Sequence, residues 1–129
     1  MAEHTKPAQG TFCWNELVST DPDKARPFYK ELIGWEIVDS GMPGMKYEML
    51  KAGDSNVGGM MKMPEEAKEV PSHWMAYITV DDVDACAAKV KDLGGHIIHG
   101  PQDIPTVGRF VIIQDPTGAV VSLITLASQ

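Results

Sequence analysis

The stretch WNELVSTDPDKARPFYKELIG, residues 14–34, decides the fold when it is set beside WMAYITVDDVDACAAKVKDLGG, residues 74–95. In each stretch a tryptophan stands seven residues before an aspartate and twenty before a glycine, and the two stretches are offset by 60 residues. Further residues keep this offset: Ala25 with Ala85, positions 37–38 with 97–98, and Gly58 with Gly118. A constant offset over several landmarks indicates one supersecondary unit that is used twice.

The first unit predicts a strand, a helix and three more strands. Residues 11–19 are rich in aromatic and β-branched side chains, as strands are. Asp21 and Pro22 are typical of a helix cap and a first helical residue, and apolar residues then recur at spacings of three and four up to Gly34. Short strands are expected at 35–39, 47–51 and 57–61.

The second unit repeats this order after a polar stretch that contains two prolines. A strand is expected at 74–80, a helix capped by Asp81 or Asp82 and ended by Gly94 and Gly95, and strands at 96–99, 108–114 and 119–126. The predicted class is α+β with tandem βαβββ modules. We expect a tail at 1–10 and one domain at 11–126, with module one at about 11–61, a linker at 62–72 and module two at about 73–126.

Composition and charge limit the classes of molecule that the chain is expected to bind. The chain has 129 residues and a formal net charge of −7, and its lysines and arginines are scattered, so nucleic acid is not an expected partner. No apolar run approaches the roughly 20 residues that span a bilayer, so no membrane partner is expected either. The polar start lacks a secretory signal, and the two cysteines are far apart, which favours a cytoplasmic protein with free thiols.

Several motifs, in this order, resemble the vicinal-oxygen-chelate superfamily, the glyoxalase/bleomycin resistance protein/dioxygenase family. They are Phe28–Tyr29 with Leu32–Trp35, Gly58–Met61, Val80–Asp84, Leu93–Gly95 and Asp115–Gly118. The resemblance implies two modules whose sheets form a curved-sheet cup, a small-molecule ligand in the cleft between them, and a homodimer by analogy. In metal-using members a divalent ion is held there by His, Gln or Glu from the first and last strand of each module.

The positions that the resemblance assigns to metal ligands carry unsuitable side chains. They fall at Trp14, at Trp74 (or Met75 if the strand register slips by one), at Ser122, and near Lys62, the 60-residue partner of Ser122. Indole has no available lone pair and an ammonium repels a cation. We therefore name no cofactor, although the resemblance leaves a divalent metal open.

The candidate ligand-binding residues are Trp14, Glu16, Met60, Trp74, Arg109 and Ser122. Trp14 and Trp74 would face each other as a stacking floor for a flat ligand, or else pack in the core. Glu16 lies two residues beyond Trp14, hence on the same strand face, and is the candidate acid/base or hydrogen-bonding group. Arg109 could hold a ligand anion or pair with Asp103 or Asp115.

Three functions stay open, of which the third is an interaction module, a remnant of longer two-domain relatives. The first is a protein that binds a small, partly apolar or planar molecule in the cleft without the usual metal. The second is a lyase- or dioxygenase-like enzyme that uses Glu16 in acid/base chemistry or a relocated metal held by Glu16 and His73.

Overall fold

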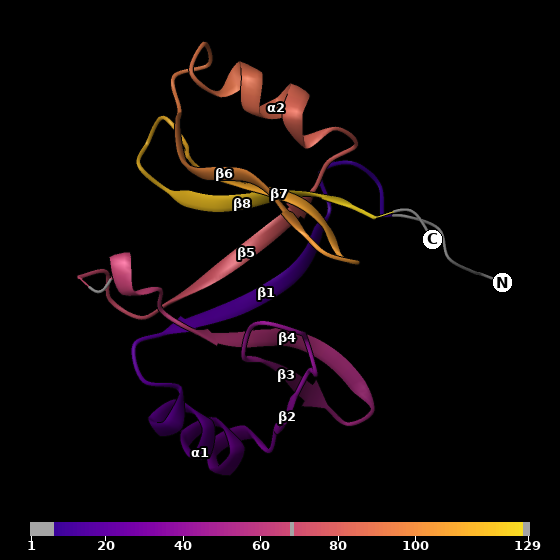
Figure 1. The fold of residues 1–129 in the computed structure, drawn as a ribbon, viewed down its shortest axis with the longest axis vertical. Coiled ribbons are helices and arrows are strands. Elements are labelled where there is room, and N and C mark those ends of the chain that lie inside the picture. The colour runs from indigo at the N-terminus through magenta and orange to yellow at the C-terminus, as the bar shows by residue number, and fades with distance from the viewer. Residues whose placement is uncertain (1–6, 68, 128–129) are drawn as a thin grey trace, which may run out of the picture. The chain divides into compact units, whose positions relative to one another are not determined.

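The computed structural model describes residues 7–67 and 69–127 and arranges them as two compact units (Figure 1). One unit runs from Trp14 to Met75. The other joins the described residues before Trp14 to those from Ala76 onward. Within the described residues neither α-helix is long and apolar enough to cross a lipid bilayer.

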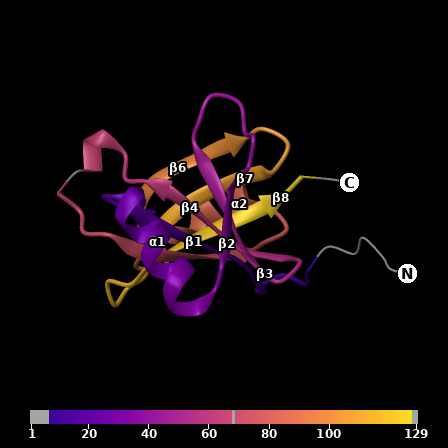
Figure 2. The same ribbon diagram turned by 90° about the horizontal axis from the view of Figure 1, so that it is seen from below.

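The first unit has the predicted order of a strand, a helix and three strands. Its elements are β1 (Phe12–Ser19, in this unit from Trp14 onward), α1 (Pro22–Ile33), β2 (Glu36–Asp39), β3 (Tyr47–Ala52) and β4 (Ser55–Lys62), followed by a short 3-10 turn at Glu65–Ala67. The strands lie in the order β2-β3-β4-β1, with β1 parallel to β4 and the other pairs antiparallel. Helix α1 covers one face of these strands (Figures 1 and 2).

The ends of α1 follow from the residues that were predicted to set them. Asp21 is the N-cap, and its carboxylate accepts a hydrogen bond from the backbone N–H of Lys24 at 3.3 Å, while Pro22 opens the helix. Gly34 ends the helix with a φ of 79°, and its N–H donates to the carbonyl of Lys30 at 3.0 Å. That left-handed backbone suits glycine because glycine has no Cβ.

The core of the first unit lies between α1 and the sheet. Leu17, Leu50 and Met60 are buried there, and Tyr29 and Trp35 pack against them. Full burial of such an apolar side chain stabilises a fold by roughly 1.5–3 kcal/mol. The face of the sheet that carries Leu17 is therefore the helix side of this unit.

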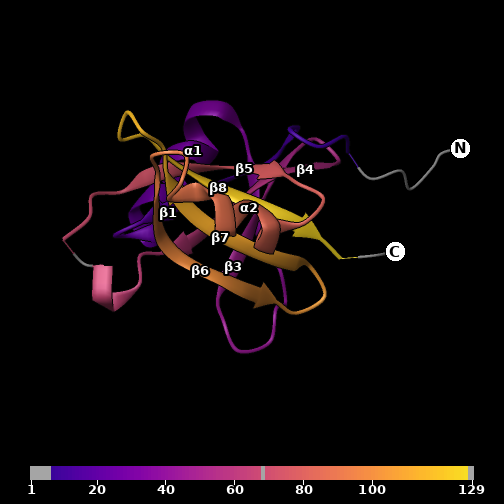
Figure 3. The ribbon, with the colours of Figure 1, turned by 90° about the horizontal axis from the view of Figure 1, so that it is seen from above.

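The second unit repeats the same order of elements. It contains β5 (His73–Thr79, in this unit from Ala76 onward), α2 (Val83–Val90), β6 (His96–Ile104), β7 (Gly108–Gln114) and β8 (Val120–Leu126). The strands lie in the order β5-β8-β7-β6, with β5 parallel to β8. Helix α2 packs beside β6, β7 and β8, and its Val83 joins Val80 and Val111 in the core (Figures 1 and 3).

The tandem βαβββ order is confirmed, but the offset between the units is not a constant 60 residues. The N-cap of α2 is Asp82, whose carboxylate accepts from the N–H of Ala85, so Asp21 and Asp82 are 61 apart. Counting seven residues back from each cap matches Trp14 with Met75. The equivalence of Trp14 and Trp74 is therefore wrong by one residue, and in a strand one residue reverses the face.

The offset grows further along the chain. Glu16 pairs with Gly59 across β1 and β4, and Tyr77 pairs with Ser122 across β5 and β8. Because Glu16 and Tyr77 are 61 residues apart, the counterpart of Ser122 in the first unit is Gly59. The expected match of Ser122 with Lys62 is wrong, because the connections between strands differ in length.

Candidate functional site

Trp14, Glu16 and Tyr47 lie together on the face of the first unit opposite α1. Leu17 packs toward the helix, and side chains alternate along a strand, so Trp14 and Glu16 point the other way. Tyr47 lies on β3, two strands away from β1 in the order β2-β3-β4-β1. The predicted common face of Trp14 and Glu16 therefore follows from the strand geometry, whereas Tyr47 was not anticipated.

A chain of hydrogen bonds joins these three side chains. The indole Nε1–H of Trp14 donates to Tyr47 Oη at 2.9 Å, and the Tyr47 hydroxyl donates to Glu16 Oε1 at 2.8 Å. The exposed fraction is 7% for Glu16 and 8% for Tyr47. A carboxylate with so little access to water needs such donors, because burial of an uncompensated charge is costly.

Gly59 explains how Tyr47 reaches Glu16 across the intervening strand β4. A Cβ built on Gly59 would lie 1.8 Å from Tyr47 Oη and 2.2 Å from its ring carbon Cζ. Gly59 is also the strand partner of Glu16. The tyrosine ring thus occupies the space where any other residue at position 59 would place a side chain.

This arrangement fixes one oxygen of a carboxylate beside a flat apolar ring. The Trp14–Tyr47–Glu16 chain orients Glu16 Oε1, and hydrogen bonds in series polarise one another. Chemically, the carboxylate can accept a hydrogen bond or a proton from a bound molecule, and the half-buried indole offers it a stacking surface.

Trp74 does not share this face. Its ring contacts Tyr29 with centroids 5.7 Å apart and Trp35 with centroids 6.0 Å apart, and both partners pack against the core on the helix side. The predicted floor of Trp14 and Trp74 facing each other is therefore wrong. The one-residue shift in register is the physical reason, and a ligand contact by Trp74 alone stays a prediction.

The matching positions of the second unit hold Tyr77, Phe110 and Ser122. Tyr77 contacts the ring of Phe110 at a centroid distance of 6.3 Å. Ser122, next to Tyr77, is fully buried, and its hydroxyl has no hydrogen-bond partner among the described residues. A buried hydroxyl without a partner is uncommon, and it keeps Ser122 a candidate ligand contact.

The other candidates lie elsewhere. Arg109 is half-buried and pairs with Asp103 at 3.2 Å, as predicted, and with Asp84 on α2 at 3.1 Å. The hydrogen bonds that Arg109 donates to Asp103, and next those it donates to Asp84, raise the pKa of its guanidinium. The carboxylate of Asp115, the other predicted partner, instead accepts from Thr117 within its own turn, which lowers its pKa.

Met60 and His73 have different surroundings. Met60 is almost completely buried in the core on the helix side. His73 opens β5, and its Nδ1 lies 2.9 Å from the carbonyl oxygen of Pro71. A ligand or metal role for either residue stays a prediction.

The residues at the implied metal positions do not suit a divalent ion. With the register corrected, these positions hold Trp14, Gly59, Met75 and Ser122, which together supply no carboxylate and no imidazole. Across residues 7–67 and 69–127, no three His, Cys, Asp or Glu side chains gather as a metal-binding group.

Comparison with known proteins shows to which family this chain is similar. Residues 11–123 match the family model of the Glyoxalase/Bleomycin resistance protein/Dioxygenase superfamily. "Putative glyoxylase CFP32" of Mycobacterium bovis is 46% identical over 123 residues, which cover 93% of this chain and 46% of that protein. "Anthracycline biosynthesis protein DnrV" of Streptomyces peucetius is 32% identical over 117 residues, which cover 91% of this chain and 42% of that protein. The chain therefore spans less than half the length of these relatives.

Solved structures agree on the fold. Methylmalonyl-CoA epimerase from Mycobacterium tuberculosis superposes with a TM-score of 0.63 over 97% of this chain and 95% of that chain, at 17% sequence identity. Methylmalonyl-CoA epimerase from Streptomyces coelicolor, in complex with 2-nitronate-propionyl-CoA, gives 0.62 over 94% and 97%, at 20% identity. At such identities the likeness concerns the fold alone.

Proposed function

Because the chain belongs to the Glyoxalase/Bleomycin resistance protein/Dioxygenase superfamily, we propose that it binds a small, partly apolar or planar molecule, without the divalent metal of metal-using members. The proposed site is the sheet face that carries Trp14, Tyr47 and Glu16. The observation that carries this proposal is the buried hydrogen-bonded chain from the Trp14 indole through Tyr47 to the Glu16 carboxylate.

The chemistry of that face suits such a ligand. Binding sites for small molecules combine apolar and aromatic surface with a few fixed polar groups, and Trp14 and Glu16 supply one of each. A relative named for anthracycline biosynthesis is in keeping with this ligand class, because anthracyclines are flat fused-ring molecules with polar substituents.

Binding of a planar probe tests the proposal. Daunomycin, a fluorescent anthracycline, is titrated with wild-type protein and followed by fluorescence polarisation. We expect saturable binding that weakens about ten-fold or more in Glu16→Gln, because a hydrogen bond to a charged group is lost. Glu36→Gln removes the same charge from exposed β2 and should bind like wild type. Absence of saturable binding by wild type, or equal losses in both variants, would contradict the proposal.

A second candidate function is acid/base catalysis by Glu16. It is favoured by the bond from Tyr47 Oη to Glu16 Oε1, which leaves a carboxylate in a fixed orientation, and by a relative named as a glyoxylase. Its test is turnover of the hemithioacetal of methylglyoxal and glutathione, with and without added Zn²⁺. Turnover that disappears in Glu16→Gln supports an enzyme, and binding without turnover supports the first proposal.

The expected homodimer and the expected cytoplasmic location stay predictions. Gel filtration with light scattering tests for the homodimer that the family resemblance implies. Fractionation of the source cells tests for a cytoplasmic location.

A further inference from the structure

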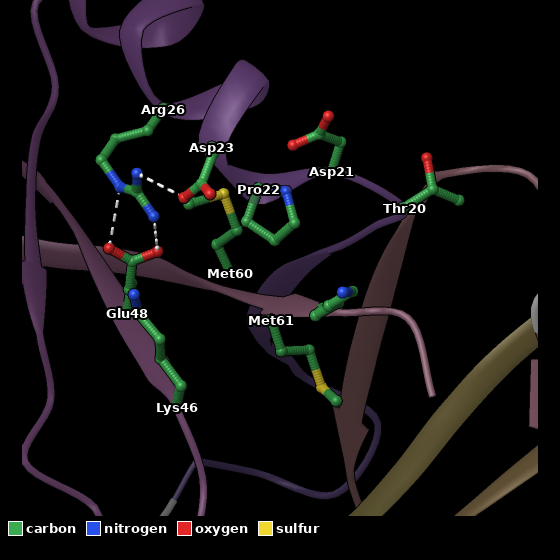
Figure 4. Close-up of a pocket in the computed structure, with 10 residues that line it drawn as sticks. Thr20, Asp21, Pro22, Asp23, Arg26, Lys46, Glu48, Met60 and Met61 are labelled. Carbon is green, nitrogen blue, oxygen red and sulfur yellow. Dashed lines mark hydrogen bonds and ion pairs between the residues drawn. The ribbon is translucent and has the colours of Figure 1, made fainter. Parts of the chain in front are cut away.

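A groove of about 400 Å³ lies on the helix side of the first unit, where α1 begins and where β3 starts and β4 ends (Figure 4). Strand alternation places it on the sheet face opposite Glu16: Glu48 pairs with Met60 across β3 and β4, and Met60 packs into the core under α1. The groove is thus separate from the proposed ligand-binding face.

The carboxylates that line the groove are already engaged. Arg26 donates to both oxygens of Glu48, from Nε at 2.9 Å and from Nη2 at 2.7 Å, and Nη1 pairs with Asp23 at 3.1 Å. Figure 4 shows this fork of Arg26 between the two acids. Asp21 caps the helix through the N–H of Lys24. The bonds to Glu48 contribute most to raising the pKa of the Arg26 guanidinium above its ordinary value.

Two lysines on the sheet side of the groove remain without such partners. Both are exposed, and across residues 7–67 and 69–127 no ion pair joins Lys46 or Lys62 to a carboxylate. Tyr47 pairs with Met61 at the start of β3, so the next residues outward, Lys46 and Lys62, lie at the same end of these two strands. Both lysines line the groove, and an anion bound between them would reduce the repulsion of their like charges.

We propose that this groove binds a small anion, a phosphate ester or a carboxylate, whose charged group lies between Lys46 and Lys62. Two ammonium groups provide up to six donors for such an anion. The first turn of α1 lines the same groove, and Asp21 and Asp23 already supply negative charge to the positive end of that helix, so the two lysines are the groups that would hold the anion. Pro22 borders the groove and gives a short apolar part of the ligand a surface to contact.

The test uses inorganic phosphate and acetate as probes, each titrated into ¹⁵N-labelled protein at constant ionic strength and followed by amide chemical shifts. We expect saturable shifts at Lys46, Lys62, Thr20, Asp21 and Asp23. The double variant Lys46→Gln/Lys62→Gln should bind about ten-fold more weakly or not at all, since hydrogen bonds to charged groups are lost. Lys89→Gln/Lys91→Gln, at the end of α2, makes the same change in net charge and should bind like wild type.

The two probes separate the sources of the anion. Saturation by phosphate alone supports a phosphate ester, saturation by acetate alone supports a carboxylate, and saturation by both supports a site for either. Shifts that do not saturate, shifts spread over the whole surface, or equal losses in both double variants would overturn the proposal. Because Glu16 lies on the other face, Glu16→Gln should leave these shifts unchanged even if the planar ligand fails to bind.

Discussion

The two units place different chemistry on the same strand pattern. Glu16 and Tyr47 in the first unit correspond in strand register to Tyr77 and Phe110 in the second. Where the first pair shares a hydrogen bond of 2.8 Å, the second makes a ring contact at 6.3 Å. The strand partner of Glu16 is Gly59, which makes room for the tyrosine, whereas the second unit has Ser122.

In the first unit this pattern holds a buried carboxylate at the place where the second unit has the phenol ring of Tyr77. Burial of the Glu16 carboxylate carries a cost in desolvation, which the hydrogen bond from Tyr47 helps to offset. A buried carboxylate held in one orientation is a candidate for function.

Each helix is joined to its sheet by an ion pair, and the two ion pairs differ in burial. Breaking them gives the largest expected change in the free energy of unfolding. Arg26 holds Glu48, whose side chain is 9% exposed, whereas Arg109 and Asp84 are 39% and 59% exposed. Arg26→Ala should lower the free energy of unfolding by about 3 kcal/mol, because Glu48 is left buried and unpaired. Arg109→Ala should cost at most about 1 kcal/mol, as exposed pairs do.

Urea denaturation of the two variants measures this contrast. A double variant, Arg26→Met with Glu48→Leu, should recover much of the loss, because it removes the unpaired charge together with its partner. Equal losses in Arg26→Ala and Arg109→Ala would show that the burial of Glu48 does not matter to stability.

Gly59→Ala should have the next largest effect. The added methyl group would clash with the Tyr47 hydroxyl and ring, which must then leave Glu16 and Trp14. We expect a loss of about 2 kcal/mol in the free energy of unfolding, the size typical of overpacking. The double variant Gly59→Ala/Tyr47→Ala shows whether the clash is responsible. If it is, Gly59→Ala should cost little stability in a protein that already carries Tyr47→Ala.

Tyr47→Phe removes only the hydroxyl and gives the first unit a phenylalanine at the position that corresponds to Phe110. It should destabilise the protein by about 1–2 kcal/mol, because a buried carboxylate and an indole N–H both lose a partner. The same change at Tyr29, which contacts aromatic rings on the helix side, is the matched control and should cost less. A larger loss in the Tyr29 variant would contradict the importance of the chain.

Ser122→Ala should have the smallest effect and the opposite sign. The Ser122 hydroxyl is buried without a partner among the described residues, so its removal should leave stability unchanged or raise it by about 0.5–1 kcal/mol. Thermal unfolding measures the change. A clear loss of stability would indicate that the hydroxyl has a partner, such as a bound water.

Much of the fold could be predicted from the sequence, because its signals are local. The helix cap at Asp21, the stop at Gly34 and strand β7 at 108–114 depend on residues within a few positions of each other. The sequence allows either Asp81 or Asp82 to cap α2. The difference of one residue between them changes the register of the second unit and therefore the face on which Trp74 is expected.

Of the three residues in the hydrogen-bonded chain, two could be predicted from the sequence. Strand alternation placed Trp14 and Glu16 on one face, since it needs no knowledge of neighbouring strands. Tyr47 was missed because its bond to Glu16 crosses β4 and depends on the absence of a side chain at Gly59. Such contacts appear only once the register of three strands is known.

The tryptophan indole resonances give the most direct test of a ligand site at the Trp14–Tyr47–Glu16 chain. The protein has three tryptophans, so a ¹⁵N spectrum should contain three indole N–H signals to follow during a titration with daunomycin. We expect the Trp14 signal to move with saturation, while those of Trp35 and Trp74, which pack on the helix side, stay in place. Movement confined to Trp35 and Trp74, or no movement of Trp14 at saturating daunomycin, would contradict it.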